Sequence, residues 1–178
     1  KTEGEVIILA VHTLGVLHIL DKTGTIKSID DLKGKTLVAS GQGSLPQYVL
    51  NFILSENGIN PETDIEIVYK AEHSEVATLL LSGQADIVML PEPFVSTVMN
   101  KDKSIVHAID LNAEWVKKAP DITLSMGCLV AQKSFIEENP EEVNTFLDLY
   151  KESIEWVLEE PYNAAPYIVS SGILDNET

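Results

Sequence analysis

The sequence predicts an α/β fold, and three observations lead to this prediction. Residues 36–110 alternate three times between short apolar runs of strand length and longer segments with helical spacing. Gly41 and Gly43 lie where the first run turns into its helix, and glycine allows the sharp turn that this junction needs. Residues 86–90 form an apolar run of the kind found in central strands covered on both faces. Together these features indicate a parallel sheet with helices on both of its faces.

Composition restricts both the class of protein and the class of partner. The chain has 178 residues, of which 44% are hydrophobic, and this is enough for one large domain or two small ones. The 12 basic and 28 acidic residues give a net charge of -16, which argues against nucleic acid and anionic lipid as partners. No apolar stretch of the sequence approaches the length of a membrane span.

Cys128 is the only cysteine, so the chain has no internal disulfide. It lies in the apolar run 126–131, where we expect a buried and unreactive thiol. The first residues contain no signal peptide, and the chain opens on Lys1 without an initiator methionine. We therefore expect a processed or excised piece of a longer protein.

The stretch 35–58 organises the rest of the chain. Residues 36–39 predict a buried strand, and Ser44 followed by Gln47 has the spacing of a capping box at a helix start. The free N–H groups of the first helical turn can receive an anionic or polar ligand group. Pro46 and the lack of a Gly-Lys-Ser/Thr sequence exclude the dinucleotide and Walker fingerprints. A tight turn with a capped helix, and no ligand, is the alternative.

Apolar spacing predicts the remaining elements. The other expected strands are Val6–Val11, Val16–Leu20, Ile65–Lys70, Ile105–Ile109 and Leu124–Gln132. The other expected helices begin at Ser28, at Ser74 as the cap, at Phe94, at the capping pattern Asn139–Glu142 and at Tyr162. We expect 6–11 to be buried on both faces and 115–120 to be irregular.

The loops that follow the parallel strands are expected to meet at one edge of the sheet. Right-handed crossovers bring 40–44, 72–74 and 91–93 to the carboxyl edge, where open α/β sheets bind ligands. The candidate ligand-binding residues there are Ser40, Gln42, Gly43, Ser44, Leu45, His73 and Glu92. Glu92, held between two prolines, suits a ligand that carries an amine or other donors besides a polar or anionic group. A surface glutamate at a turn is the alternative.

The sequence shows no pattern typical of catalysis or of a metal centre. The four histidines, at positions 12, 18, 73 and 107, lack metal-ligand spacing. His12 and His18 lie in or beside apolar strands, where a core or surface histidine is expected. No Gly-x-Ser-x-Gly nucleophile elbow is present, and the adjacent carboxylates fall on faces predicted to be solvated. We therefore expect a protein that is not an enzyme and that uses neither a metal nor a cofactor.

Five motifs occur in an order that resembles a known family. They are Asp31-Leu-Lys-Gly-Lys-Thr-Leu, Ser40-Gly-Gln-Gly-Ser, Leu80-Leu-Ser-Gly-Gln-Ala-Asp-Ile, Pro91-Glu-Pro-Phe and Asn139-Pro-Glu-Glu. This order resembles the extracytoplasmic solute-binding proteins of ABC importers, in the branch with nitrate, sulfonate, taurine and thiamine-precursor binders. The resemblance covers nearly the whole chain. It implies a periplasmic-binding-protein type II fold, in which two α/β lobes joined by two crossover segments close on a ligand.

On this resemblance, residues 25–111 form the second lobe. Residues 1–24 and 112–178 supply the crossover segments and parts of a first lobe that is incomplete in this chain. Thr13, at the break after the first strand, joins the candidate ligand-binding residues. The implied function is capture of a small polar solute and its delivery to permease subunits. The implied location is the periplasm or the cell surface, as a lipoprotein, with membrane contact only through an anchor or permease outside this chain.

Two other functions remain open. An enzyme on the same scaffold, such as a thiamine-precursor synthase, would need reactive histidine and cysteine at the cleft, and the single Cys128 argues against it. A ligand-sensing domain of a signalling protein is the second alternative. Because the first lobe lacks its opening strands, we expect this chain to bind its solute poorly or not at all. We also expect the apolar strands 6–11 and 124–132 to pair with a second copy of the chain.

Overall fold

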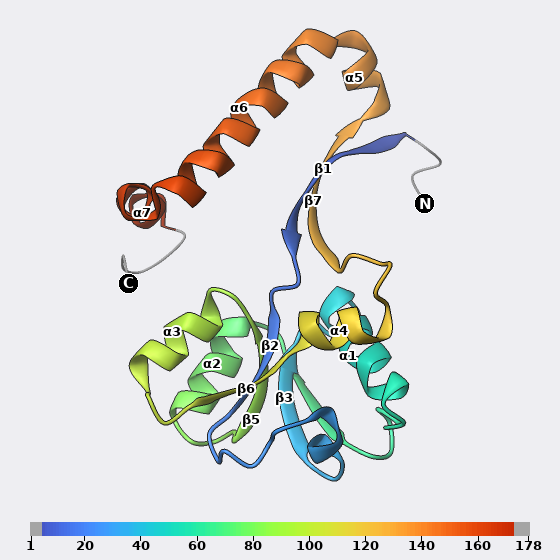
Figure 1. Ribbon diagram of the computed structural model, residues 1–178, viewed down its shortest axis with the longest axis vertical. Helices are drawn as coiled ribbons and strands as arrows, with labels where there is room; N and C mark the ends of the chain where they lie inside the picture. The colour runs from blue at the N-terminus through green and yellow to red at the C-terminus, as the bar shows by residue number, and fades with distance from the viewer. Residues whose placement is uncertain (1–4, 173–178) are drawn as a thin grey trace. The chain divides into compact units, whose positions relative to one another are not determined.

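The structure, a computed structural model, describes residues 5–172 and contains two compact units. The strands are β1 (Val6–Leu14), β2 (Leu17–Asp21), β3 (Thr36–Ser40), β4 (Glu66–Lys70), β5 (Ile87–Pro91), β6 (Val106–Asp110) and β7 (Ser125–Gln132). The helices are α1 (Leu45–Glu56), α2 (His73–Leu81), α3 (Phe94–Lys101), α4 (Leu111–Lys118), α5 (Lys133–Glu138), α6 (Pro140–Glu159) and α7 (Pro161–Ser170), with a 3₁₀ turn η1 (Ile29–Leu32). Figure 1 shows the elements within each unit.

The larger unit, Val11–Cys128, is built on a five-stranded sheet with strand order β4-β3-β5-β2-β6. β3 pairs in parallel with β4 and β5, as expected from the alternation of strands and helices. β2 lies between β5 and β6 and runs antiparallel to both. The strands of 36–110 are therefore parallel to one another, as predicted, and the antiparallel strand comes from outside that series. The alternating series 36–110 gave no sign that a strand from outside it would enter the sheet.

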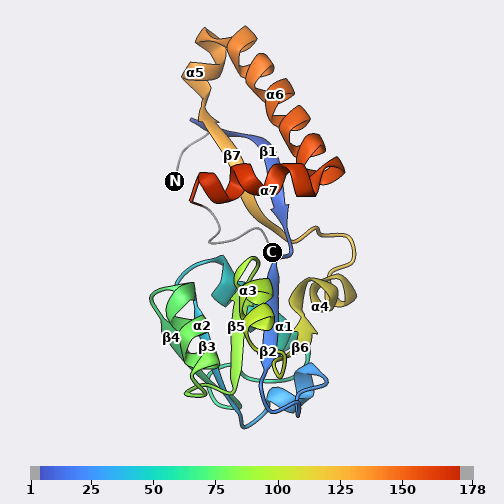
Figure 2. The same cartoon turned by 90° about the vertical axis from the view of Figure 1, so that its left-hand side faces the viewer.

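Helices cover both faces of this sheet, and each face has its own apolar core (Figure 2). On one face, Leu50, Ile53 and Leu54 of α1 pack with Leu111 of α4 against Leu37 of β3 and its neighbours. On the other face, α2 and α3 pack on β5 through buried residues that include Val76, Leu80, Val95 and Val98. The two cores fix the strands, so the loops after β3, β4 and β5 emerge at one edge.

The segment 115–120 was predicted to be irregular, and this prediction was wrong because most of it belongs to α4. The Asp110 side chain starts the helix by accepting hydrogen bonds from the backbone N–H groups of Asn112 and Ala113. Trp115 then packs on Phe52 of α1, with ring centroids 4.8 Å apart. The tertiary contact of an aromatic side chain stabilises a helix whose own sequence is polar.

The larger unit includes the whole segment 25–111 that we predicted as the second lobe, and extends it to 11–24 and 112–128. The extension follows from the packing, because β2 is a central strand of the sheet and α4 contacts α1, β2 and β6. Which lobe of a two-lobed protein each unit represents stays a prediction.

The smaller unit comprises Lys1–Ala10 and Leu129–Thr178. β1 and β7 form a two-stranded sheet, in which Gly15 N donates to Leu124 O (3.1 Å) and Lys133 N donates to Glu5 O (2.7 Å). These two bonds show that the strands are antiparallel. The boundary between the units falls within both strands, so the two strands are the covalent links between the units. Among the described residues, no helix has the length and hydropathy needed to span a bilayer.

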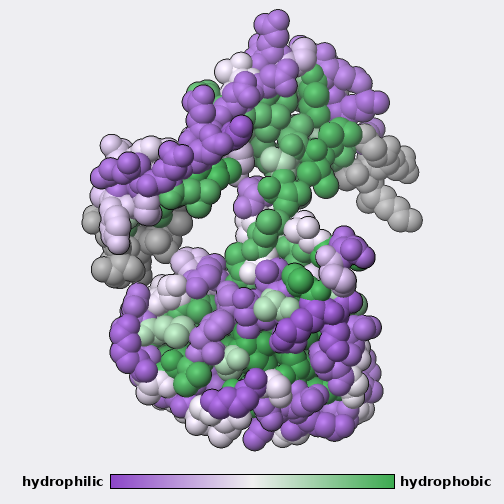
Figure 3. Space-filling view, in the orientation of Figure 1, coloured by the Kyte–Doolittle hydropathy of each residue, from purple (hydrophilic) through white to green (hydrophobic). Residues whose placement is uncertain are grey.

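The prediction that 6–11 is buried on both faces was wrong. Ile8 is 62% exposed, and Val130 on β7 is 48% exposed. Cys128 is also exposed, against the expectation of a buried thiol. The reason is that a two-stranded sheet does not enclose its strands between two covered faces, as the larger sheet does. Figure 3 shows apolar surface over this unit, and a groove there is lined by Leu9, Leu129, Val130, Ala131, Phe135, Glu142, Val143 and Phe146.

Candidate functional site

The centre of the candidate site is a contact between the end of β3 and the start of α2. Ser40, the last residue of β3, is 2% exposed, and its Oγ lies 2.5 Å from Nδ1 of His73. His73 is the first residue of α2, so this helix begins one residue before the predicted cap Ser74, and Glu72 is its N-cap. The ring of Phe94, the first residue of α3, lies 5.5 Å from the His73 ring. Three loops predicted to converge at this edge do so.

The His73 side chain is neutral at neutral pH. Burial lowers the pKa of His73 below its usual value of 6.5, and the nearby Glu72 carboxylate opposes this only in part. A neutral imidazole carries one N–H and one lone pair, so the ring can either donate to the Ser40 oxygen or accept from its hydroxyl. The pair therefore holds a hydroxyl and an aromatic nitrogen at fixed positions on the edge of the sheet.

The loop between β3 and α1 turns through Gly41 and Gly43, whose φ angles are +80° and +74°. A Cβ on Gly41 would come within 3.0 Å of Pro46 Cγ, so this close approach requires glycine. Ser44 is the N-cap of α1, as predicted, but its side chain and that of Gln47 do not form the hydrogen bonds of a capping box. Ser44 Oγ donates to Gly41 O (2.7 Å), and Gln47 Oε1 accepts from Gly43 N (2.6 Å).

The loop keeps two backbone donors exposed. Gln42 and Leu45 have exposed side chains, and within residues 5–172 their backbone N–H groups have no hydrogen-bond partner. These N–H groups lie at the N-terminus of α1, where the helix dipole adds partial positive charge. The loop can therefore donate to an acceptor that approaches from solvent.

Glu92 follows β5 and is engaged with its own helix. One carboxylate oxygen accepts from Ser96 N (3.1 Å) and the other from Ser96 Oγ (3.0 Å). The backbone N–H of Glu92 donates to Val16 O (3.0 Å), which fixes this turn to the strand that enters the sheet. The side chain stays exposed, so it caps α3 and presents negative charge to solvent at the same time.

Thr13 lies on β1 and has a separate set of contacts. Its Oγ1 is 2.8 Å from His12 Nδ1, and a Cβ on Gly127 of β7 would come within 2.9 Å of the same oxygen. Within the described part of the chain, no hydrogen bond joins Thr13 to the other candidate residues. The structure thus brings Ser40 and His73 into contact and leaves Thr13 on the two-stranded sheet.

Two histidines that sequence reasoning set aside lie together in the larger unit. His18 Nδ1 and His107 Nε2 are 2.8 Å apart, with the ring centroids 4.8 Å apart. They come from β2 and β6 and are 89 residues apart in the sequence. The only available signal was that both sit in short apolar runs, which does not reveal that these runs become neighbouring strands.

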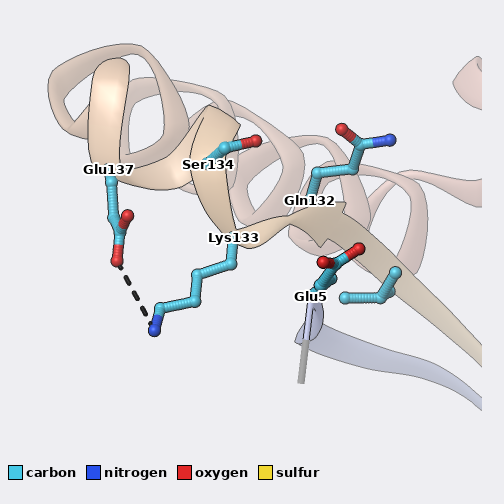
Figure 4. Close-up of a pocket in the computed structure, with 6 residues that line it drawn as sticks. Glu5, Gln132, Lys133, Ser134 and Glu137 are labelled. Atoms are coloured by element: carbon cyan, nitrogen blue, oxygen red, sulfur yellow. Dashed lines mark ion pairs between the residues drawn. The ribbon is translucent and has the colours of Figure 1, made fainter. Parts of the chain in front are cut away.

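A separate polar pocket lies in the smaller unit, at the start of α5 (Figure 4). It is lined by Glu5, Val6, Gln132, Lys133, Ser134 and Glu137, and the Lys133 ammonium lies 3.7 Å from the Glu137 carboxylate. None of the candidate residues lines it. The ion pair is exposed and spans one helical turn, so it adds little to stability.

Comparison with known proteins decides the family. The sequence profile described as "NMT1/THI5 like" matches residues 6–164. The chain belongs to the NMT1/THI5-like family. Within curated proteins, YtlA of Bacillus subtilis (strain 168), which carries the name of a binding protein, is 27% identical over 128 residues. That match covers 72% of this chain and 36% of YtlA.

Solved structures show the fold of this NMT1/THI5-like chain. The periplasmic aliphatic sulphonate-binding protein SsuA of Escherichia coli has a TM-score of 0.76 at 18% identity, over 96% of this chain and 56% of SsuA. An ABC transporter protein from Parabacteroides distasonis has a TM-score of 0.73 at 20% identity, over 96% and 55%. SsuA of Xanthomonas axonopodis pv. citri, bound to MOPS, has a TM-score of 0.70 at 16% identity, over 96% of this chain and 56% of that protein. The fold is that of type II periplasmic binding proteins, and the chain spans about half the length of these structures.

Proposed function

We propose that this chain is part of the substrate-binding component of an ABC importer. It binds a small polar solute at the carboxyl edge of the sheet in the larger unit. The observation that carries the proposal is the Ser40–His73 contact, which joins the loops after β3 and β4 at this edge. Membership of the NMT1/THI5-like family and the likeness to binding proteins support a binding role. The protein would work outside the cytoplasm and deliver the solute to the permease subunits of the importer.

The donors at this edge determine which solute groups it can accept. The N–H groups of Gln42 and Leu45, at the start of α1, favour an anionic or strongly polar acceptor. The exposed Glu92 carboxylate favours a donor such as an amine, although it is also hydrogen-bonded to Ser96. We therefore propose a solute with an acceptor group bound by the loop and a donor group near Glu92. Gly43, Ser44 and the Thr13 hydroxyl are further proposed contacts.

A ligand-panel thermal shift tests this proposal, with sulfonates, carboxylates and amines tested up to millimolar concentration. A solute at about a hundredfold excess over its Kd should stabilise the protein by about 2.7 kcal/mol. Native mass spectrometry on the purified protein identifies any solute that is retained. The proposal fails if no member of the panel binds, or if a bound compound is converted to a product, which would indicate an enzyme.

A further inference from the structure

We propose that His18 and His107 form a binding site for Cu²⁺, coordinated by His18 Nδ1 and His107 Nε2. The site lies on the sheet of the larger unit, and the proposal does not depend on the function proposed above. The sequence does not reveal the site, because the two residues are 89 positions apart. It arises only when β2 and β6 pair.

The register of the two strands places both rings on one face of the sheet. His18 is opposite Asp110, and Leu20 is opposite His107, with a register shift between Ile19 and Leu20. His18 and Leu20 are two residues apart, so their side chains share a face. β6 is an edge strand, and His107 is exposed while His18 is half-buried. A metal ion can therefore reach the pair from solvent.

The two nitrogens are close enough to bind one metal ion together. They are 2.8 Å apart, at hydrogen-bond distance, and imidazole nitrogens bind first-row metals at about 2.0 Å. Tetragonal coordination by N and O ligands is typical of Cu²⁺, which also binds such sites more tightly than its neighbours in the first-row series.

Binding requires a small rearrangement and a change of tautomer in one ring. In the metal-free pair, one imidazole N–H lies between the two nitrogens as a hydrogen bond. For Cu²⁺ to bind, the ring that donates this hydrogen bond gives up its proton to solvent and takes one up on its other nitrogen, so both imidazoles stay neutral and the site gains the two positive charges of the metal. Each ring must also turn about its χ2 torsion to aim its lone pair at the metal, and this torsion is soft for histidine.

The charges around the pair favour a cation. The carboxylates of Asp110 and Glu92 interact electrostatically with His18, as does the neighbouring His107 ring. The two negative charges attract a cation to this pair. Within residues 5–172, no group of three or more histidine, cysteine, aspartate or glutamate side chains can hold a metal. The remaining positions on copper are therefore taken by water.

Electron paramagnetic resonance of the protein titrated with Cu²⁺ tests the site. We expect a tetragonal signal with hyperfine coupling to two nitrogens at one equivalent. His18→Asn and His107→Asn should each weaken Cu²⁺ binding at least about tenfold by isothermal titration calorimetry, a change of about 1.4 kcal/mol. His12→Asn is the matched control, since it removes an exposed histidine from β1, and it should leave the affinity unchanged.

Two outcomes would overturn the proposal. One is that the variant lacking both histidines binds Cu²⁺ as tightly as the parent protein. The other concerns the unaltered protein, which can be measured even if a variant fails to fold. Cu²⁺ should broaden the NMR signals of the His18 and His107 rings before those of His12 and His73. Equal broadening of all four rings, or a signal from a single nitrogen, would show adventitious binding only.

Discussion

Ser40 and His73 are joined by a hydrogen bond between the end of β3 and the first residue of α2. Their side-chain atoms are 2.5 Å apart, and Ser40 is 2% exposed. A buried hydroxyl group needs a hydrogen-bond partner. Without one, it has lost its hydrogen bonds to water and gained none in return, which costs the full free energy of desolvation. The contact therefore stabilises the fold and, at the same time, fixes two polar groups at the edge where we propose that the solute binds.

Removing one member of this pair should cost more than removing both. His73→Leu leaves the Ser40 hydroxyl buried and unpaired, so we expect a loss of about 1–3 kcal/mol in the free energy of unfolding. Adding Ser40→Ala to His73→Leu should return part of this loss, because no unpaired polar group remains. Urea unfolding of the two single variants and the double variant measures the coupling. Strictly additive effects would show that the hydrogen bond contributes nothing to stability.

The same residue predicts how stability depends on pH. Burial lowers the pKa of His73 in the folded protein below 6.5, whereas the unfolded chain keeps the usual value. The unfolded state therefore binds more protons as the pH falls below 6.5, and folding stability decreases. This decrease in stability ends once the pH lies below the pKa of His73 in the folded protein. The parent protein should lose stability relative to His73→Leu over this range, as measured by urea unfolding at several pH values. A constant difference between the two proteins would contradict the prediction.

Gly43 and Gly58 form a matched pair for testing the loop. Both have positive φ angles, +74° and +72°, and neither has an atom within 4 Å of an added Cβ. A valine at either position should cost at least about 1–2 kcal/mol from backbone strain alone. Only Gly43→Val should also weaken solute binding, because Gly58 lies beyond the other end of α1. Calorimetric titration with the solute and urea unfolding separate the two effects. Similar losses of affinity in both variants would mean that the glycines are only structural.

Two substitutions at Glu92 separate its two contacts. Glu92→Ala removes the acceptor of Ser96 N–H and should destabilise the protein by about 1 kcal/mol through loss of the α3 cap. Glu92→Gln keeps an oxygen acceptor and removes the charge, so stability should change less. If Glu92 binds a solute amine, Glu92→Gln should weaken the affinity for the solute, measured by calorimetry. Unchanged affinity would refute the proposed role of Glu92.

The exposed two-stranded sheet predicts self-association. Among the described residues, β1 and β7 pair only with each other, which leaves their outer edges unpaired, and Ile8 and Val130 expose apolar surface. Sedimentation velocity over a range of concentrations should show a dimer or larger species. Ile8→Lys should raise the monomer fraction, since lysine at an edge opposes pairing. Val116→Lys on α4 is the control, because it makes the same charge change at a position that is 49% exposed. A monomer at all concentrations would refute this prediction.

The sequence determined those features whose signals are local. The strand at 36–40, the glycine turn and the helix that starts after Ser44 all appear where apolar periodicity, glycine and proline placed them. The order of the motifs also pointed to the family that the profile match then showed. These signals succeed because a helix or strand inside one apolar core is specified mainly by its own residues and their spacing.

Tertiary structure decided what depends on residues far apart in the sequence. The antiparallel entry of β2 into the sheet, the formation of α4 and the contact between His18 and His107 all require partners outside the local segment. The same holds for β1, whose apolar sequence matched that of a covered strand although it forms a two-stranded sheet with β7. Apolar spacing reports that a face can be buried. Whether it is buried, and against which residues, is set by the neighbours that the whole fold provides.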